Sequence, residues 1–263
     1  MYEFDEDTRI RQQSSGCFVG ELTDRWSIGN VPNGGYVMAI ALDALARSMP
    51  ASDPVTATAH FLRPARPGPF EVATEVIKLG GRHANGSERM LQDGEELIRV
   101  LATFGDLESA SGPERIAARP PALPDRRECL GRGETGAMPE IARRFDQRFD
   151  PDTMRWVRGE HTGDMVVAAW QRFADGREPD VRSLPVFADA LPPPIFNAVP
   201  PSWAPTIELT IHVRERPQPG WLRSRFATRF LFGGYFEEDG EIWDESGTLV
   251  ALSRQLAAAP RVQ

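Results

Sequence analysis

The sequence has little of several residue types that mark particular protein classes. Only two cysteines, Cys17 and Cys129, occur in 263 residues, too few and too far apart for a disulfide scaffold or a zinc site. No apolar run approaches about 18 residues, which argues against a transmembrane helix. The acidic N-terminus also lacks the apolar stretch of a signal peptide. We therefore expect a reduced, cytoplasmic protein that does not associate with a membrane.

Basic residues are also in the minority. Lys and Arg number 30 against 38 Asp and Glu, which gives a formal net charge of −8. Because binding to a phosphate backbone depends on a basic surface, we expect no nucleic-acid partner. Lys78 is the only lysine, so nearly all basic residues are arginines. The planar guanidinium group of arginine can bind a phosphate locally. A GC-rich genome, which favours arginine codons, explains the same excess of arginine.

Two common catalytic motifs are absent. The chain contains no GxSxG, which removes the nucleophile elbow of the α/β-hydrolases, and no P-loop. Its four histidines never occur at HxxxH or HExxH spacing, so no metal site is predicted. No cofactor is implied.

The chain divides into an N-terminal unit (1–107), a connector (108–150) and a C-terminal unit (151–263). The connector is rich in Pro, Arg, Gly and Ser and short of strand patterns, with a short helix expected over PEIARRFD. We therefore expect two folded units joined by an irregular segment.

A duplication relates the two units. TATAHFLRPARPG aligns with ELTIHVRERPQPG, so that Thr58 coincides with Thr210 and His60 with His212. Later matches keep nearly the same offset. The equivalent positions of the two histidines predict a structural role in each sheet.

Both units show the same order of elements. In the first, Asn33 can cap a helix within PNGGYVMAIALDALARSMP, which is apolar on most sides and should be buried. Strands are expected over VTATAHFL, PFEVATEVIKL and ELIRVLATFG. The second unit has a helix slot, SLPVFADALPPPIFN, which its prolines must shorten, and strands over TIELTIHVR, WLRSRFATRFLF and TLVALSRQLAA. A buried helix ahead of an antiparallel sheet is an α+β pattern.

Asp189 is a candidate base because it lies in an apolar helix. Burial removes water from a carboxylate and raises its pKa toward neutrality. The alternative interpretation is that Asp189 caps the short helix or pairs with a surface arginine.

Thr206 and Gln255 lie on predicted strands and can hold a water beside a base. Strand alternation places Thr206 on one face with Glu208, Thr210 and His212. Gly34 and Gly35 open the first helix, where backbone N–H groups can polarise a developing oxyanion. Taken singly, Thr206 and Gln255 are more commonly ordinary sheet residues, and the two glycines also fit close packing of the helix on the sheet.

The blocks resemble the acyl-CoA thioesterase superfamily of double-hotdog proteins and are similar to its type II (TesB-like) members. The resemblance covers nearly the whole chain outside the connector, in the blocks WSIGNVPNGGYVMAIAL, HFLRPARPGPFEV, LQDGEELIRVLATF, FADALPPP, WAPTIELTIHVRERPQPGWL and SRQLA. It implies two tandem hotdog units, each a long helix wrapped by an antiparallel sheet. It also implies a homo-oligomer and a role in lipid metabolism.

The resemblance also implies a mechanism. Matched by position, the family's catalytic Asp, Ser/Thr and Gln fall on Asp189, Thr206 and Gln255. Asp189 would activate a water held by the other two, and the water would attack an acyl-CoA thioester near Gly34 and Gly35. The PPP after Asp189 and the sequence ELTIHVR depart from the family pattern, which bears on the acyl pocket.

Two alternatives are a non-catalytic acyl-CoA-binding protein and, ranked lower, an enoyl-CoA hydratase. The hydratase pattern places a histidine where Pro194 stands. Possible contacts for CoA phosphates are Arg63, Arg66 and Arg82, although solvated surface arginines are commoner.

Overall fold

The computed structural model describes residues 1–51, 53–136 and 138–260. The N-terminal half contains α1 (Glu3–Asp7), β1 (Ile10–Ser14), β2 (Cys17–Leu22), β3 (Ser27–Ile28), β4 (Val31–Pro32), α2 (Gly34–Ala46), β5 (Asp53–Phe61), β6 (Gly68–Leu79), β7 (Ala84–Gln92) and β8 (Glu95–Gly105). The C-terminal half contains β9 (Phe145–Phe149), β10 (Val166–Phe173), α3 (Leu184–Phe187), β11 (Thr206–Val213), β12 (Leu222–Ala227), β13 (Leu231–Phe232), β14 (Tyr235–Trp243) and β15 (Leu249–Ala258). Short 3-10 turns lie at Asp24–Trp26, Arg132–Glu134, Glu140–Arg144, Pro151–Thr153, Arg155–Arg158 and Pro194–Asn197.

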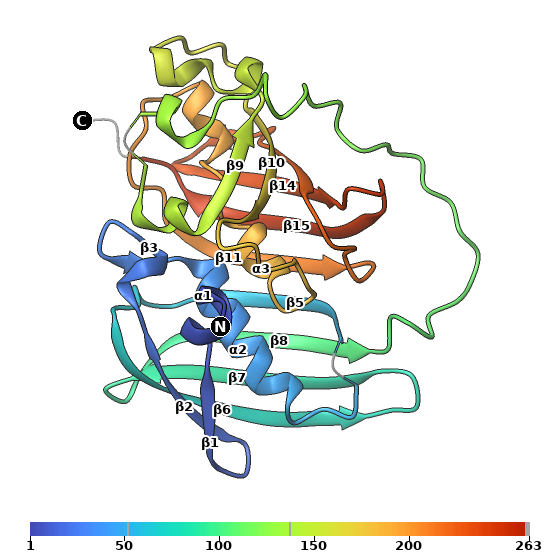
Figure 1. Cartoon of the computed structure of the whole chain (residues 1–263). Helices are drawn as coiled ribbons and strands as arrows, with labels where there is room; N and C mark the ends of the chain where they lie inside the picture. Colours follow the sequence, from blue (N-terminus) through green and yellow to red (C-terminus); the bar gives the residue numbers. More distant parts are fainter. Residues whose placement is uncertain (52, 137, 261–263) are drawn as a thin grey trace.

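Most strands belong to one antiparallel sheet. Its order among the described residues is β1-β2-β6-β7-β8-β5-β11-β15-β14-β12-β10-β9, with β13 paired to β14. Strands β5 and β11 lie side by side at the middle and join the two halves (Figure 1). Helix α2 packs on β5 to β8, and α3 packs on α2. This confirms the α+β, double-hotdog arrangement.

The central strand pair carries the duplication seen in the sequence. Thr58 lies directly opposite Thr210, and their hydroxyl oxygens are 2.8 Å apart. Because repeat-equivalent residues face each other across an antiparallel pair, a local twofold axis passes between them. His60 and His212 flank this axis, and both are exposed.

Helix α2 begins where the sequence predicts. The Asn33 side chain accepts a hydrogen bond from the Tyr36 N–H (3.0 Å), which satisfies one of the open donors of the first turn. Nearly every residue from Gly35 to Leu45 is buried, as the apolar run predicts. Gly35 is where α2 meets α3, since a Cβ on Gly35 would lie 2.3 Å from the Pro185 carbonyl oxygen.

The second unit has a helix of one turn rather than a long one. Helix α3 ends at Phe187, and the three prolines from 192 to 194 are followed by the 3-10 turn Pro194–Asn197. Proline lacks an N–H and its ring obstructs the preceding turn, so the helix cannot continue through this run. The shortening that the prolines predict is confirmed, and it leaves Asp189 just beyond the helix end.

Several strands lie outside the segments predicted as strands, among them β1, β7, β9 and β14. β7 and β14 contain Gly86 and Gly240, which weaken the strand pattern, but both glycines face the packed interior where a Cβ would clash. β9 lies within the predicted connector and pairs with β10. The helix expected near its start is the 3-10 turn Glu140–Arg144.

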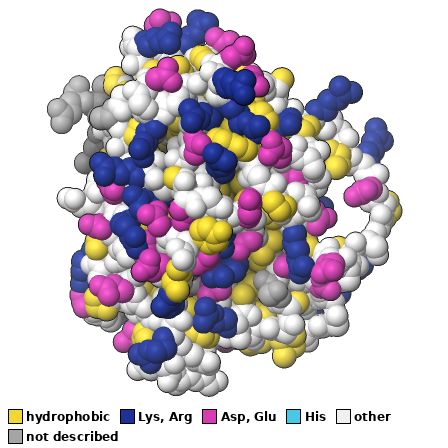
Figure 2. Space-filling model, in the orientation of Figure 1, with side chains coloured by type: hydrophobic (Ala, Val, Ile, Leu, Met, Phe, Trp, Pro, Cys, Tyr) yellow, Lys and Arg dark blue, Asp and Glu magenta, His cyan; other side chains and the backbone are white. Residues whose placement is uncertain are grey.

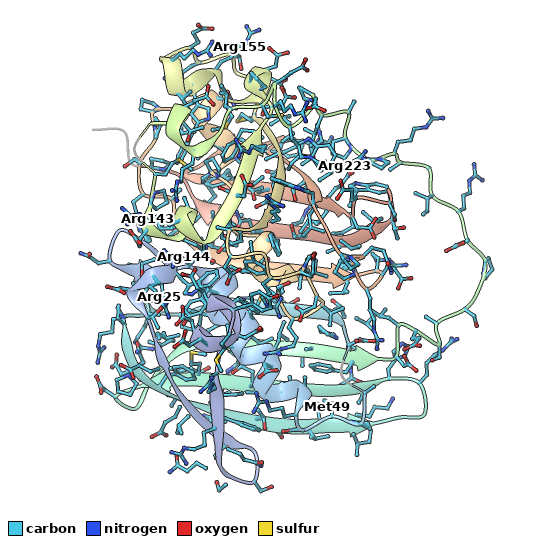
Figure 3. All side chains as sticks on the ribbon, in the orientation of Figure 1. Arg25, Met49, Arg143, Arg144, Arg155 and Arg223 are labelled. Atoms are coloured by element: carbon cyan, nitrogen blue, oxygen red, sulfur yellow. The ribbon has the colours of Figure 1, made fainter. Side chains whose placement is uncertain are left out.

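The rest of the connector runs outside the sheet from β8 to the second half (Figure 1). The Trp170 indole N–H donates to the Pro124 carbonyl (3.1 Å), and Arg126 pairs with Glu245 (2.7 Å). The Arg126 guanidinium also lies over the Trp170 ring, as does that of Arg223, which Figure 3 labels. These contacts fasten part of the connector to the second half.

Charges of both signs are interspersed on the face seen in Figure 2. This mixed surface agrees with the charge balance of the chain. Within the described residues, no helix is both long and apolar enough to cross a membrane.

Candidate active site

Asp189 of the C-terminal half lies against the start of α2 in the N-terminal half. Its Oδ2 accepts hydrogen bonds from the Gly35 N–H and from the Asn33 side-chain amide, both at 2.8 Å. Burial raises the pKa of Asp189 to about 6, while the donors Gly35, Asn33 and Gly34 oppose that rise. A carboxylate with this pKa is ionised at neutral pH and still basic enough to take a proton.

Asn33 connects the two halves through both ends of its amide. Its oxygen caps α2, and its nitrogen donates to the carboxylate and to the main-chain carbonyl of Asp189, each at 2.8 Å. The sequence identified Asn33 as a helix cap but not as a partner of Asp189. An Asn at a cap always has an unused N–H₂ group, which is the signal that could have suggested a second partner.

Two buried glutamines hold the chain on either side of Asp189. The Gln171 amide donates to the Phe187 carbonyl (3.3 Å) and to Ser224 (2.8 Å), and the Gln147 amide donates to the Ala190 carbonyl (3.1 Å). These carbonyls have no continuing helix to satisfy them because α3 ends here. β9 and β10 therefore supply the donors that position Asp189, a role not predicted from the sequence.

Gln171→Leu should lower the free energy of unfolding by about 1–3 kcal/mol, because it leaves a buried carbonyl and a buried hydroxyl without their partner. Gln12→Leu, at an exposed position of β1, is the control and should change stability little. Urea unfolding of both variants measures the difference. Equal midpoints for the two would contradict the positioning role of Gln171.

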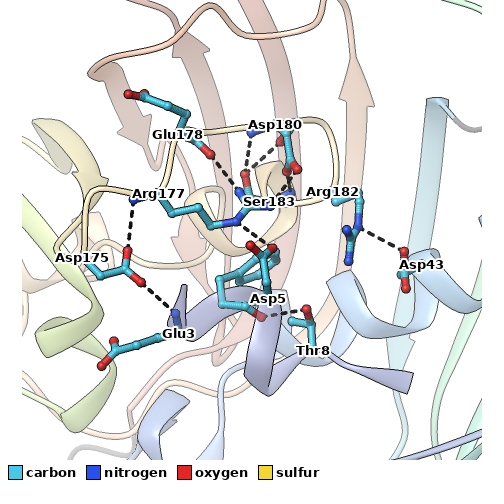
Figure 4. A network of polar contacts seen from close by, with 11 residues as sticks. Glu3, Asp5, Thr8, Asp43, Asp175, Arg177, Glu178, Asp180, Arg182 and Ser183 are labelled. Carbon is cyan, nitrogen blue, oxygen red and sulfur yellow. Dashed lines mark hydrogen bonds and ion pairs between the residues drawn. The ribbon is translucent and has the colours of Figure 1, made fainter. Parts of the chain in front are cut away.

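The segment before α3 is held by an ion-pair network (Figure 4). Arg177 is buried and donates to Asp5 of α1 (2.8 Å) and to Asp180 (2.7 Å). Asp180 and Ser183 exchange hydrogen bonds through main chain and side chain, which shapes the entry into α3. The N-terminal helix thus helps to set where α3 and Asp189 lie.

Thr206 and Gln255 lie together on neighbouring strands. The Thr206 hydroxyl donates to Gln255 Oε1 (3.1 Å). The β11–β15 register shifts between Thr206 and Glu208, which is a β-bulge at Ile207. The bulge moves Thr206 to the same face as Leu209, so the expectation that Thr206 shares a face with Glu208 is wrong.

A second buried carboxyl group, Glu238, connects these residues. It lies directly opposite Gln255 in the β14–β15 pair, and both side chains belong to residues only 6% exposed. Burial raises the pKa of Glu238 well above its usual range, and the charge of Asp189 raises it further. Glu238 therefore lies beside Gln255 and close enough to Asp189 to respond to its charge. That Asp189, Thr206 and Gln255 act together as one catalytic site stays a prediction.

The predicted glycines also lie here. The Gly35 N–H is bonded to Asp189, and a Cβ on Gly34 would lie 3.1 Å from Asp189 Oδ2 and 2.9 Å from the Phe61 ring. Both glycines permit this close approach, and their N–H groups lower the pKa of the carboxyl. Their action on an acyl oxygen stays a prediction.

Another buried aspartate, on α2, differs from Asp189 in its partners. Asp43 of α2, within a second Asp-Ala-Leu sequence, pairs with Arg182 (3.0 Å, Figure 4) and Arg47 (2.7 Å). Two guanidinium groups hold this carboxylate, whereas the donors to Asp189 from the described part of the chain are all neutral. Of the two carboxylates, Asp189 is the one suited to act as a base.

Other predicted contacts lie on the surface. Arg63 pairs with Glu95 (3.0 Å), Arg66 pairs with Asp93, and Arg82 is exposed. Their contact with CoA phosphates stays a prediction. Among the described ranges, no group of three or more His, Cys, Asp or Glu side chains could hold a metal ion. Residues 131–136, GRGETG, have GxGxxG spacing, but they include a 3-10 turn and do not join a strand to a long helix.

Comparison with known proteins identifies the family of the chain. The family model for the acyl-CoA thioesterase N-terminal domain matches residues 22–105, and that for the C-terminal domain matches residues 113–259. A proposed thioesterase II of Thermobifida fusca is 31% identical, with a TM-score of 0.91, over 99% of this chain and 98% of its own.

Two further proteins are similar over most of their length. A protein of unknown function with a hot dog fold from Alicyclobacillus acidocaldarius has a TM-score of 0.89 at 22% identity over 100% of both chains, which supports the fold. The thioesterase-like protein TwmA of Talaromyces wortmannii is 26% identical over 97% of this chain and 91% of its own. Because the two domain models together span most of the sequence, the protein belongs to the acyl-CoA thioesterase family, is TesB-like, and is a thioester hydrolase.

Proposed function

We propose that the protein hydrolyses an acyl-CoA to the free acid and CoA, with Asp189 as the general base. One observation carries the proposal: hydrogen bonds hold Asp189 Oδ2, whereas Oδ1 accepts none from the described residues. A carboxylate tethered by one oxygen keeps the other available to accept a proton from water.

Thr206 determines how that water is oriented. A hydroxyl has one hydrogen, and Thr206 donates it to Gln255, so toward a water Thr206 can only accept. The water then donates one hydrogen to Asp189 and the other to Thr206. Its lone pair is left to attack the thioester carbon.

The proton is conserved through the reaction. Asp189 takes a proton from the water while the water oxygen forms a bond to the acyl carbon. When the carbon–sulfur bond breaks, Asp189 returns that proton to the CoA thiolate. The products are a carboxylic acid and a thiol, and no covalent acyl-enzyme is required.

The pH dependence of kcat/KM should show an acid limb with a midpoint near pH 6. Burial raises the pKa of Asp189 to about 6, and only the ionised carboxylate can act as a base. Activity is therefore retained above pH 6 and should fall about tenfold per pH unit below it. Initial rates between pH 4 and pH 8 measure the midpoint, and a limb at the ordinary carboxyl pKa, near about 4, would contradict this assignment.

Incubation with acyl-CoAs of graded chain length, followed by assay of free thiol, tests the proposed function. Release of CoA from at least one of them is expected. Tight binding without thiol release would favour the non-catalytic alternative. Addition of water to an enoyl-CoA, with the thioester intact, would favour the hydratase.

We also propose a cytoplasmic homo-oligomer. Hotdog units usually associate through sheet edges or faces, and Leu101 and Leu256 are exposed on the strands of this sheet. Light scattering of the purified protein measures its oligomeric state.

A further inference from the structure

Glu238 is buried inside the second half, although no basic group among the described residues pairs with it. It lies on the inner face of β14 between the buried residues Phe236 and Gly240. The charged groups that act on it are Asp189 and Asp239, both acidic. A buried carboxyl group without a basic partner is costly, so its presence requires a reason other than ion pairing.

The polar partner of Glu238 is Gln255. Directly opposite residues of an antiparallel pair have Cβ atoms about 4.5–5.5 Å apart, so the Gln255 amide is within reach of the Glu238 carboxyl group, and Gln255 opposes the rise in the pKa of Glu238. The other end of that amide, Oε1, accepts from the Thr206 hydroxyl. Thr206 therefore donates to one end of the Gln255 amide, and the other end, Nε2, is left to donate to Glu238 across the strand pair.

The fold itself does not require this polar pair. In the first half, Gly86 lies opposite Ala102, at the positions that the repeat relates to Glu238 and Gln255. Neither has a polar side chain, and the strands still pair. The polar version occurs in the half that carries Asp189.

We propose that Glu238 is a positioning residue of the active site, which accepts a hydrogen bond from Gln255 Nε2 and so keeps Gln255 Oε1 on the Thr206 hydroxyl. Without that acceptor, Nε2 is a buried donor with no partner, and the amide must turn or shift to find one. Thr206 then loses the acceptor for its hydrogen. Its hydroxyl could donate to the water and occupy the lone pair needed for attack. This inference rests on the proposed function.

Four proteins test the inference: the wild type, Glu238→Met, Gln255→Met and the double variant. Methionine keeps approximate length and removes the polar atoms. Glu238→Met should lower kcat about tenfold with KM unchanged, because the loss affects the water and not acyl-CoA binding. The double variant should be no slower than Gln255→Met, since Glu238 acts only through Gln255. Glu238→Gln keeps a carbonyl acceptor and should restore most of kcat.

The acid limb of the pH profile of Glu238→Met shows whether the variant only loses the positioning of Gln255 or also disrupts the surroundings of Asp189. In Glu238→Met it should stay near pH 6, because the surroundings of Asp189 are intact. A limb that moves toward the ordinary carboxyl pKa indicates that the site has opened, and it overturns the proposal. If Glu238→Met does not fold, the same comparison is made with Glu238→Val, because valine is favoured in strands. The double variant then combines Glu238→Val with Gln255→Met.

The remaining outcomes separate this inference from the proposed function. Full activity of Glu238→Met, or losses that multiply in the double variant, overturn the role of Glu238 alone. A wild type that releases no CoA from any acyl-CoA overturns the proposed function, and the inference fails with it. Asp189→Asn, measured in parallel, shows whether the rate depends on the base.

Discussion

Asp189→Asn should lower kcat for acyl-CoA hydrolysis at least about 100-fold, because it removes the general base. The asparagine oxygen can still accept from the Gly35 N–H and the Asn33 amide, so the contact between α2 and the α3 region is kept. Its N–H₂ group replaces the oxygen that would take the proton. Thiol release measures kcat. Thermal unfolding and acyl-CoA binding show whether the fold and the substrate site are kept.

Asp152→Asn is the matched control. Asp152 is largely exposed and pairs with Arg155 at the surface, so the same chemical change should leave kcat unaltered. An Asp189→Asn variant with wild-type turnover would remove Asp189 from the mechanism. A variant that loses both acyl-CoA binding and folded stability would show that Asp189 is structural.

Gly35→Ala should lower both stability and activity. The added Cβ would lie 2.3 Å from the Pro185 carbonyl oxygen and 2.9 Å from Asp189 Cβ, so α2 and α3 must separate. Overpacking costs about 1–3 kcal/mol, and the better helix propensity of alanine returns at most about 1 kcal/mol. Displacing the base by about 1 Å can lower kcat about 100-fold.

Gly81→Ala controls for the loss of a glycine, because a Cβ on Gly81 would meet no atom within 4 Å and the backbone there is not left-handed. Chemical unfolding and thiol release should show wild-type values for this control. Undiminished turnover of Gly35→Ala would mean that the close approach of the two helices does not position Asp189.

Local pattern was sufficient for much of the fold. The cap at Asn33, the apolar run of α2 and the prolines after Asp189 each act over a few residues, so their effects could be predicted. The match of Thr58 with Thr210 also predicted the duplication, and the two residues meet in the central strand pair. β7 and β14 were missed because their glycines are explained only by the side chains packed over them.

The site was predicted less completely. Asp189, Thr206 and Gln255 were identified because their residue types match a family pattern. The bulge at Ile207, which turns Thr206 inward, could not be predicted, because polar and apolar residues alternate regularly along this strand. Glu238 lies in the acidic run GYFEEDGE, where sequence alone suggests a solvated turn.

The sequence by itself determined the elements, the two related units and the types of residue able to activate water, because these depend on neighbours in the chain. Only the tertiary structure decided which groups act on Asp189. Its donors come from α2, more than 150 residues earlier in the chain, and its carbonyl neighbours are held from β9 and β10. The basicity of a carboxyl group depends on the water and charges around it, and these are set by how the two halves pack.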